Sequence, residues 1–267
     1  MEKIRLDNLL VEQGLVPSRE KARSLILAGE VMLQGRRLDK PGMFIDAQSR
    51  VDIRQKMPYV SRGGLKLEKA LTFFDLDLTG KTIIDIGAST GGFTDCALQR
   101  GAAKVYAVDV GYGQLDWTLR NDPRVINLEK TNIREVDPLL WPELADLIMI
   151  DVSFISTRLV FPVAKMLLRQ GGQIIALIKP QFEAGRKQVG RKGVVRDKTV
   201  HIQVLLNCIG YLRENDLYAH CATYSPLTGP QGNIEFFILA DQEKTEPQIN
   251  DKAAAVTVEA AHHQLKP

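Results

Sequence analysis

The sequence predicts an α/β protein in which a Rossmann-like domain follows a small α+β domain. Three observations support this prediction. The character of the chain changes near residue 60, strand-like and helix-like segments alternate from there on, and a glycine-rich turn joins the first strand of that alternation to a helix. We expect domains over residues 1–57 and 61–243, a linker over 58–60 and a C-terminal tail over 244–267.

The N-terminal segment has the pattern of two helices followed by short strands. Apolar residues at helical spacing in LDNLLVEQG predict a first helix that Gly14 ends. Ser18 is placed to cap a second helix over PSREKARSLILAG, and EVMLQGRRL and RVDI are expected to be strands. A unit of about 55 residues is small for a self-sufficient core.

The longer segment shows the alternation that is typical of a parallel sheet covered by helices on both faces. We expect helices over residues 65–74, 93–101, 156–172 and 197–216. We expect strands over residues 81–87, 104–110, 124–130, 145–154, 173–180, 217–225 and 234–240. The tail from Lys244 is polar and then alanine-rich, which fits a weak helix or disorder.

Composition and length exclude several classes of protein. With 267 residues and 45% hydrophobic content, the chain can form a globular core. No apolar run approaches the roughly 18 residues of a membrane span. The start, MEKIRLDNLL, lacks the apolar segment of a signal peptide, so a cytoplasmic protein is expected.

The three cysteines, Cys96, Cys208 and Cys221, show no metal-ligand spacing, and no metal is expected. The net charge of +3 permits a nucleic-acid partner without requiring one.

The stretch DIGASTGG lies between a predicted strand and a predicted helix. Glycines at positions 87, 91 and 92 would let the backbone approach a ligand closely and adopt positive φ. Asp109 ends the next strand, where its carboxylate can accept hydrogen bonds from ribose hydroxyls. A plain tight turn with a solvated aspartate is the structural alternative, but the strand context on both sides favours a nucleotide-like cofactor.

NAD and S-adenosylmethionine both fit a turn of this kind. The NAD fingerprint is G-x-G-x-x-G, whereas this chain has G-x-x-x-G-G preceded by Asp85. That pattern resembles the first motif of Rossmann-like S-adenosylmethionine methyltransferases. The resemblance implies a cofactor-binding set of Asp85, Gly87, Ser89, Thr90, Gly91, Gly92, Asp109 and Asn132. Asn132 follows the third strand, where such enzymes often contact the adenine, but a helix cap explains it equally well.

Four charged residues occupy related places along the alternation. Asp151 and Lys179 end two neighbouring strands, so both would project into the ligand crevice of an open α/β sheet. Glu235 begins a late strand and would reach the same edge if that strand is antiparallel, and Lys66 lies on the helix before the first strand. Charges beside buried strands need a partner or a ligand. A structural ion-pair cluster is the alternative to a catalytic set.

This Lys-Asp-Lys-Glu set resembles the tetrad of 2′-O-ribose RNA methyltransferases of the FtsJ type. Methyl transfer from a sulfonium requires the enzyme to hold the 2′-hydroxyl near the methyl carbon and to remove or share its proton. Lys179 is our candidate for contacting that hydroxyl, as a base if neutral or as an electrostatic stabiliser if charged. The four groups would titrate together, so the sequence leaves this choice open.

The N-terminal segment resembles an S4-type RNA-binding domain. Its candidate phosphate-facing residues are Arg5, Arg19, Lys21, Arg23, Arg36 and Arg37. A second basic run, GRKQVGRKGVVRDK, follows Lys179 and offers Arg186 and Lys187 to an RNA backbone, with a solvated surface loop as the alternative.

Taken together, these motifs in this order resemble the TlyA family of rRNA 2′-O-methyltransferases, whose members are also named hemolysin A. The resemblance extends over residues 2–240 and includes YVSRGGLKLEKAL, DIGASTGGFTD, MIDVSFIS, ALIKPQFE and GNIEFF. It implies methylation of cytidine 2′-hydroxyls in ribosomal RNA, with ribosomal RNA or ribosomal subunits as the partner. A non-catalytic RNA-binding protein and a membrane-active hemolysin are the rival readings. The intact cofactor turn and tetrad disfavour the first, and the lack of a membrane-length segment disfavours the second. The oligomeric state does not follow from the sequence.

Overall fold

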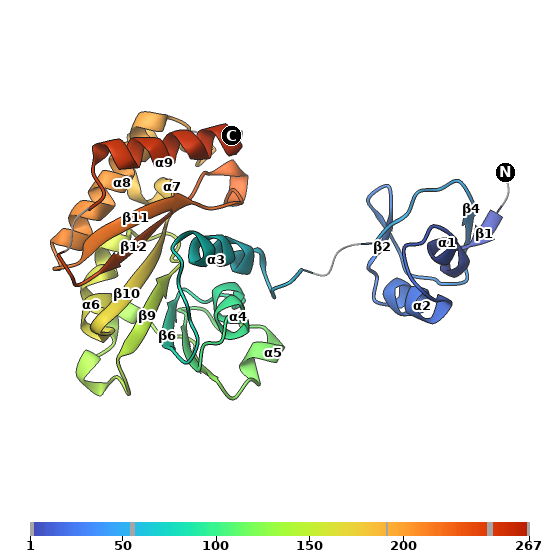
Figure 1. The fold of residues 1–267 in the computed structure, drawn as a ribbon, viewed down its shortest axis with the longest axis horizontal. Coiled ribbons are helices and arrows are strands. Elements are labelled where there is room, and N and C mark those ends of the chain that lie inside the picture. The colour runs from blue at the N-terminus through green and yellow to red at the C-terminus, as the bar shows by residue number, and fades with distance from the viewer. Residues whose placement is uncertain (1–2, 54–56, 191, 245–247, 266–267) are drawn as a thin grey trace. The chain divides into compact units, whose positions relative to one another are not determined.

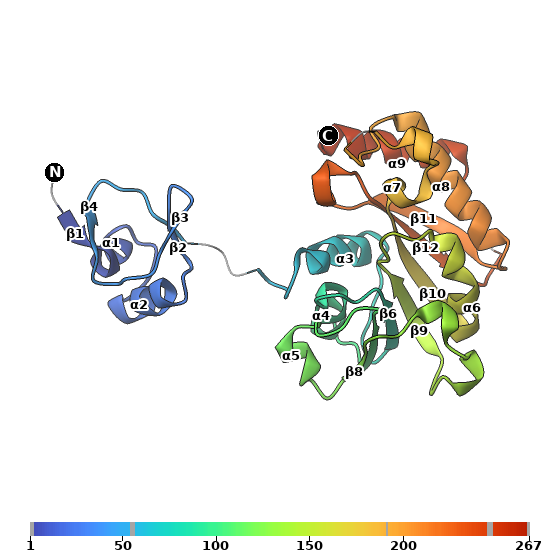
Figure 2. The same cartoon turned by 180° about the vertical axis from the view of Figure 1, so that it is seen from behind.

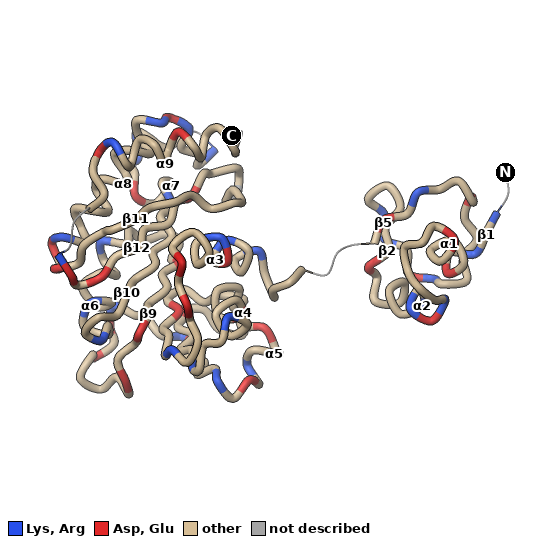
Figure 3. Tube along the Cα trace, viewed as in Figure 1, with Lys and Arg blue, Asp and Glu red and all other residues tan. Residues whose placement is uncertain are grey.

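The computed structural model of the protein describes residues 3–53, 57–190, 192–244 and 248–265. The chain divides into two compact units, Met1–Met57 and Pro58–Pro267, and each unit has a hydrophobic core of its own (Figure 1). Lys and Arg are interspersed with Asp and Glu along both units, which agrees with the small net charge (Figure 3).

Over residues 3–53, the first unit contains two short helices and two small antiparallel sheets. Its elements are β1 (Lys3–Arg5), α1 (Leu6–Glu12), α2 (Arg19–Leu27), β2 (Val31–Leu33), β3 (Arg36–Leu38), β4 (Phe44–Asp46) and β5 (Asp52–Ile53). One sheet pairs β1 with β4, and the other has the order β3-β2-β5. Ser18 caps α2 as expected, accepting a hydrogen bond from the Lys21 amide at 3.3 Å. β1 and β4 were not predicted, because a strand of three residues is too short to show an alternation of apolar and polar side chains.

The second unit is a doubly covered α/β sheet, and its outline confirms the expected fold class. Its first elements are α3 (Arg62–Phe73), β6 (Thr82–Ile86), α4 (Gly92–Gln99), β7 (Lys104–Val108), α5 (Trp117–Arg120), β8 (Val125–Leu128), the 3-10 helices η1 (Ile133–Glu135) and η2 (Pro138–Leu140), and β9 (Ala145–Ile150). There follow η3 (Thr157–Leu159), α6 (Phe161–Leu167), β10 (Leu168–Ile178), α7 (Pro180–Glu183), η4 (Arg186–Gln188), α8 (Lys198–Arg213), β11 (Tyr218–Tyr224), η5 (Pro230–Gly232), β12 (Phe236–Asp241) and α9 (Asp251–Gln264).

Within the described residues the sheet has seven strands in the order β11-β12-β10-β9-β6-β7-β8. The strands from β10 to β8 are parallel, whereas β12 and β11 are antiparallel additions. Alternate residues of β6 enter opposite cores: Ile84 and Ile86 pack with α6, α8 and α9, and Ile83 packs with α3 and α4. Figures 1 and 2 show these two groups of helices on opposite faces of the sheet.

Three segments differ from the sequence-based expectation. The helix expected over residues 156–172 is broken into η3 and the seven-residue α6, and β10 already begins at Leu168. The C-terminal segment, expected to be a tail with a weak helix or disorder, forms the 14-residue helix α9, and its Ala254, Val258 and Ala261 are buried in the same core as residues of α6 and α8. Residues 58–60 belong to the second unit, where Tyr59 is buried beside Gly64 and the Val60 amide donates to Asp95 at 2.8 Å.

Candidate active site

Sheet register brings the predicted charged residues to one edge of the sheet. Ile86 at the end of β6 pairs with Ile150 at the end of β9, so the glycine turn and Asp151 emerge side by side. Ile178 of β10 pairs with Phe236 of the antiparallel strand β12, so the residues just beyond this pair, Lys179 and Glu235, meet at the same edge. The antiparallel orientation on which the prediction for Glu235 depended is therefore confirmed.

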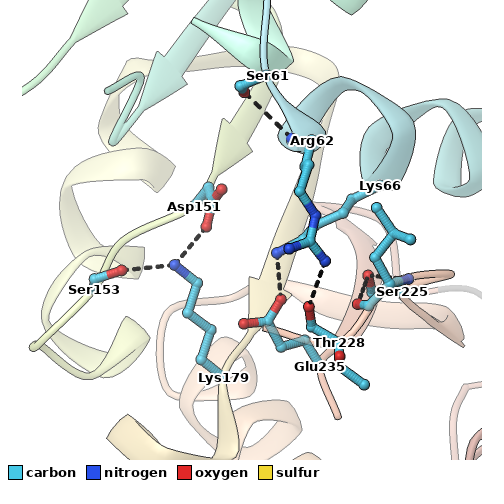
Figure 4. A network of polar contacts seen from close by, with 11 residues as sticks. Ser61, Arg62, Lys66, Asp151, Ser153, Lys179, Ser225, Thr228 and Glu235 are labelled. Atoms are coloured by element: carbon cyan, nitrogen blue, oxygen red, sulfur yellow. Dashed lines mark hydrogen bonds and ion pairs between the residues drawn. The ribbon is translucent and has the colours of Figure 1, made fainter. Parts of the chain in front are cut away.

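Lys179 lies between two oxygen ligands. Its Nζ is 2.6 Å from Asp151 Oδ1 and donates to Ser153 Oγ at 2.7 Å (Figure 4). The Lys179 side chain is 11% exposed and that of Asp151 is 21% exposed, so the pair is largely shielded and yet reachable from the crevice. The oxygens of Asp151 and Ser153 hold the flexible Lys179 amine in one position, from which it can contact a bound substrate.

Lys66 and Glu235 form the second pair. Lys66 Nζ donates to Glu235 Oε2 at 2.6 Å, and the Glu235 side chain is fully buried. Burial raises the pKa of Glu235, and the Lys66 ammonium opposes that effect. The other oxygen, Oε1, is buried without a hydrogen-bond partner among the described residues. A Cβ at Gly229 would lie 2.1 Å from this oxygen, so only glycine leaves room for the carboxylate there.

The glycine turn after β6 has the shape of a ligand cradle. Gly87 has φ of 89°, and a Cβ there would lie 2.5 Å from the Asp151 carbonyl oxygen. Alanine at this position would therefore be strained and would separate the turn from Asp151. Gly91, the N-cap of α4 with φ of 92°, faces inward against Leu115 and Leu119 instead of a cavity.

Asp109 lies across the turn from Gly87. Its two carboxylate oxygens accept hydrogen bonds from the amides of Ser89 at 2.8 Å and Gly111 at 2.7 Å. A carboxylate can accept about four hydrogen bonds, so two further donors can still be bound. Asn132 is the cap of η1, one of the two roles that the sequence left open: its Oδ1 accepts from the Arg134 amide at 3.3 Å, and its Nδ2 donates to Glu135 Oε1 at 2.5 Å. It also lines the same cavity as Asp109, so a contact with adenine stays a prediction.

Asp85 lies beneath the turn and is fully buried. Thr94 Oγ1 donates to Asp85 Oδ2 at 2.7 Å, and Oδ1 has no partner among the described residues. Burial raises the pKa of Asp85 to about 7, and the nearby Asp151 and Asp109 carboxylates add to the rise. An acid with this pKa is protonated in part of the molecules near neutral pH, and a cation close to the turn would favour its ionised form.

The raised pKa of Asp85 predicts a pH dependence of stability. Between about pH 4 and about pH 7 the unfolded chain loses this proton while the folded chain keeps it, so the free energy of unfolding falls as the pH rises. Asp85→Asn should remove this contribution. Urea unfolding of both proteins from pH 4 to pH 8 measures the difference between their free energies of unfolding. Other titrating groups, such as the buried His201, are present in both proteins, so their contributions cancel in this difference. A difference that does not change with pH would contradict the assignment.

Three cavities meet at the charged residues. A cavity of about 480 Å³ is lined by Asp109, Asn132, the glycine turn and Asp151. One of about 550 Å³ extends from the glycine turn, including Thr90 and Gly92, to the first turn of α3 and the loop at Thr228. One of about 430 Å³ is lined by Lys66, Lys179, Glu235, Phe154 and Phe182. The first two share Gly87, Ser89 and Asp151, and the last two share Lys66.

The candidate RNA-contacting residues fall into two groups. Lys21 and Arg23 on α2, Arg36 and Arg37 on β3, and Arg186 and Lys187 on η4 are exposed and available to a partner. Arg5 and Arg19 instead bind the fully buried carboxylate of Asp7, at 2.9 and 3.2 Å. These two bonds lower the pKa of Asp7 to about 2. Arg5 and Arg19 therefore also have a structural role that sequence reasoning did not foresee.

Sequence reasoning also missed residues that line the site. Ser153 and Phe154 follow Asp151 in the chain, and Phe154 is 87% exposed with a positive φ of 65°. Its ring lies 5.0 Å from that of Phe182, centroid to centroid. Arg62 precedes Lys66 on α3 and donates to the Thr228 carbonyl at 3.2 Å. The adjacency of Ser153 and Phe154 to the strand end was a usable signal, but nothing in the sequence indicates the bond between Arg62 and Thr228.

Comparison with known proteins gives matches over nearly the whole chain. Residues 59–242 match the family description "FtsJ-like methyltransferase", and residues 4–51 match "S4 domain". The chain is 48% identical over 270 residues to "Putative rRNA methyltransferase YqxC" of Bacillus subtilis, covering 99% of this chain and 96% of that protein. It is 42% identical to "16S/23S rRNA (cytidine-2'-O)-methyltransferase TlyA" of Mycobacterium tuberculosis, covering 88% of each.

A solved structure extends the likeness to the complete chain. It is named "Putative hemolysin from Streptococcus thermophilus" and is 43% identical, with a TM-score of 0.77 over 100% of this chain and 98% of that one. The word hemolysin is part of that related protein's name and describes nothing observed in this chain. Among the residues that our structure describes, every helix is too short or too polar to cross a membrane.

Proposed function

The chain belongs to the FtsJ-like methyltransferase family and carries an S4 domain, and from this we propose that it methylates the 2′-hydroxyl of cytidine in ribosomal RNA. The observation that supports the proposal most strongly is the pairing of Lys179 with Asp151 and of Lys66 with Glu235, at 2.6 Å each, beside the glycine turn. Relatives named as rRNA cytidine-2′-O-methyltransferases support the substrate. The proposed partner is ribosomal RNA, either free or within a ribosomal subunit.

S-adenosylmethionine is the methyl donor, and when bound it supplies a methyl group already activated on a sulfonium. The residues present fit it. Asp109 has free acceptor positions for ribose hydroxyls. Asn132 lines the same cavity, and the second N–H of its amide, beside the one that donates to Glu135, would be offered to an adenine ring. Gly87 leaves the backbone open where a Cβ would close the space toward Asp151. The partnerless Oδ1 of buried Asp85 lies under a turn that would face a cation.

Lys179 is the group that we assign to the reacting hydroxyl. Asp151 and Ser153 hold its amine at the edge of the cavity that Lys66 and Glu235 also line. From there the amine can contact the 2′-oxygen, orient a lone pair toward the methyl carbon and share or accept the departing proton. Asp151 is a positioning residue in this scheme. Buried Glu235 keeps a second amine, that of Lys66, in the same cavity as Lys179, where it would lie close to the oxygen.

The cavity of about 430 Å³ and the exposed basic residues are the parts of the protein that would bind RNA. A nucleotide entering beside Lys66, Lys179 and Glu235 would meet the rings of Phe154 and Phe182, on which a base can stack. Exposed basic residues on α2, β3 and η4 would hold the phosphate backbone. Phosphate contacts position the RNA, and the base at the aromatic rings is where selection for cytidine would occur.

Asp109→Ala should weaken the binding of S-adenosylmethionine, because it removes the acceptor for the ribose hydroxyls. A hydrogen bond to a charged group is worth roughly 1.5–3 kcal/mol, which corresponds to about a tenfold to hundredfold rise in Kd. Asp116→Ala is the matched control, since Asp116 caps the short helix α5 and lines none of the three cavities. Calorimetry of the three proteins measures the effect. If Asp109→Ala bound S-adenosylmethionine as tightly as the native protein does, the cofactor would have to bind at a different site.

Methyl transfer to ribosomal RNA tests the proposed function itself. The purified chain should transfer a labelled methyl group from S-adenosylmethionine to ribosomal RNA or ribosomal subunits taken from cells that lack the enzyme. Mapping of the modified position then identifies the target nucleotide. Absence of transfer to every ribosomal substrate, by a folded protein that binds the cofactor, would overturn the proposal.

A further inference from the structure

Arg62 lies in the site and has no part in the proposed chemistry. The cavity of about 550 Å³ runs from Gly87 and Ser89 to the first turn of α3, where Ser61, Arg62 and Gly63 line it, and to Thr228 on the facing loop. Its walls carry two cations, Arg62 and Lys66 (Figure 4). A cavity with cationic side chains at one end suits a ligand that carries an oxyanion.

The two cations differ in how they are neutralised. Lys66 Nζ lies 2.6 Å from the buried Glu235 carboxylate, so its charge is balanced within the protein. Arg62 donates to a neutral acceptor, the Thr228 carbonyl oxygen, at 3.2 Å, and it forms no ion pair with any carboxylate in the part of the chain that the structure describes. Arg62 is therefore the cation of this cavity that is available to an anionic ligand.

We propose that the Arg62 guanidinium binds the carboxylate at the amino-acid end of the S-adenosylmethionine molecule. The inference rests on the proposed function, because it requires the adenosine end of the same molecule to lie at Asp109. The cavities of Asp109 and Arg62 share Gly87, Ser89 and Asp151, so a ligand fixed at Asp109 can extend past Asp151 into the space before Arg62.

This arrangement places the middle of the ligand at the shared wall, which is where the reaction needs the sulfonium. Asp151 belongs to that wall and is paired with Lys179, the residue assigned to the 2′-hydroxyl. The planar guanidinium matches a carboxylate with two parallel hydrogen bonds, a geometry that lysine cannot reproduce. Arg62 would thus set the depth to which the cofactor enters, and so the position of its methyl group relative to Lys179.

The test compares two cofactors that differ by one group. Binding of S-adenosylmethionine and of decarboxylated S-adenosylmethionine is measured for the full-length native chain and for Arg62→Ala, both with and without unmethylated ribosomal RNA. Arg62→Ala should weaken binding of the first by about tenfold or more and leave binding of the second unchanged. Arg62→Lys should recover only part of the loss. Arg100→Ala, which removes an exposed arginine paired with Glu68, is the control and should bind both like the native chain.

Each other outcome overturns the inference in its own way. An equal loss for both cofactors would mean that Arg62 only supports the fold of the cavity. Unchanged binding of both, with an increased KM for RNA, would assign Arg62 to an RNA phosphate. Failure of the native chain to bind either cofactor, with or without RNA, would instead contradict the proposed function, which this experiment therefore tests separately.

Discussion

Lys179→Ala should abolish methyl transfer to ribosomal RNA while the protein stays folded and binds its cofactor. The amine is held by Asp151 and Ser153 at 2.6 and 2.7 Å, and these two partners between them line all three cavities. A group positioned to orient or deprotonate a nucleophile contributes roughly 10²- to 10⁴-fold to the rate. Because this contribution arises in the transition state, kcat should fall by that factor, whereas KM for RNA and Kd for S-adenosylmethionine should change little.

Two further variants define what Lys179 does. Lys179→Arg keeps the positive charge but has a planar head that cannot lose its proton, so it should also fail if the compact amine is needed. Lys198→Ala is the matched control, because Lys198 pairs with Glu259 on α9 and lies on α8, outside the three cavities. Single-turnover rates and thermal melting are measured for all three. Native turnover by a folded Lys179→Ala enzyme would require a different proton acceptor.

Removal of residues 1–57 should leave a folded domain that binds S-adenosylmethionine and has lost nearly all activity on ribosomal RNA. The second unit keeps both of its cores without the first, since none of the residues that form them precedes Tyr59. The loss of several phosphate contacts at moderate salt should lower kcat/KM for RNA by about 10³-fold. Filter binding of RNA and methyl-transfer rates at several salt concentrations measure the effect.

A full-length variant separates lost RNA contacts from any harm done by truncation. Changing the exposed Lys21, Arg23, Arg36 and Arg37 to alanine keeps the hydrophobic core of the first unit and removes only charges. Arg5 and Arg19 are left in place because they hold buried Asp7. The variant should reduce kcat/KM for RNA and flatten its salt dependence. Full activity of both proteins on ribosomal substrates would mean that the first unit is not needed for recognition.

Sequence reasoning located the charged site because strand ends are easy to find in an α/β sheet. Asp151 and Lys179 each follow an apolar run, and the parallel register aligns those ends. Glu235 required an assumed antiparallel strand, which the pairing of Ile178 with Phe236 confirms. The bond from Arg62 to Thr228 joins residues 166 positions apart, and no local pattern reports such a contact. The pairing of Ile4 with Ile45 was missed for the same reason.

The C-terminal helix shows a different limit of sequence reasoning. Its alanines give a weak amphipathic pattern, which predicts a tail that is either a weak helix or disordered. In the structure Ala254, Val258 and Ala261 pack into the main core, and His262 Nε2 lies 2.9 Å from His201 Nδ1 on α8. Small side chains bury little area each, and their contribution depends on the close approach of the neighbouring helix, which the sequence does not reveal.

Chemical identification of the product tests the central claim most directly. Ribosomal RNA from cells that lack the enzyme is incubated with the full-length chain and S-adenosylmethionine, digested to nucleosides, and analysed by mass spectrometry against synthetic standards. We predict that 2′-O-methylcytidine increases with time, and that Lys179→Ala yields none above background. Methyl groups recovered on the base of a nucleoside, with the ribose unmodified, would contradict the account of the site.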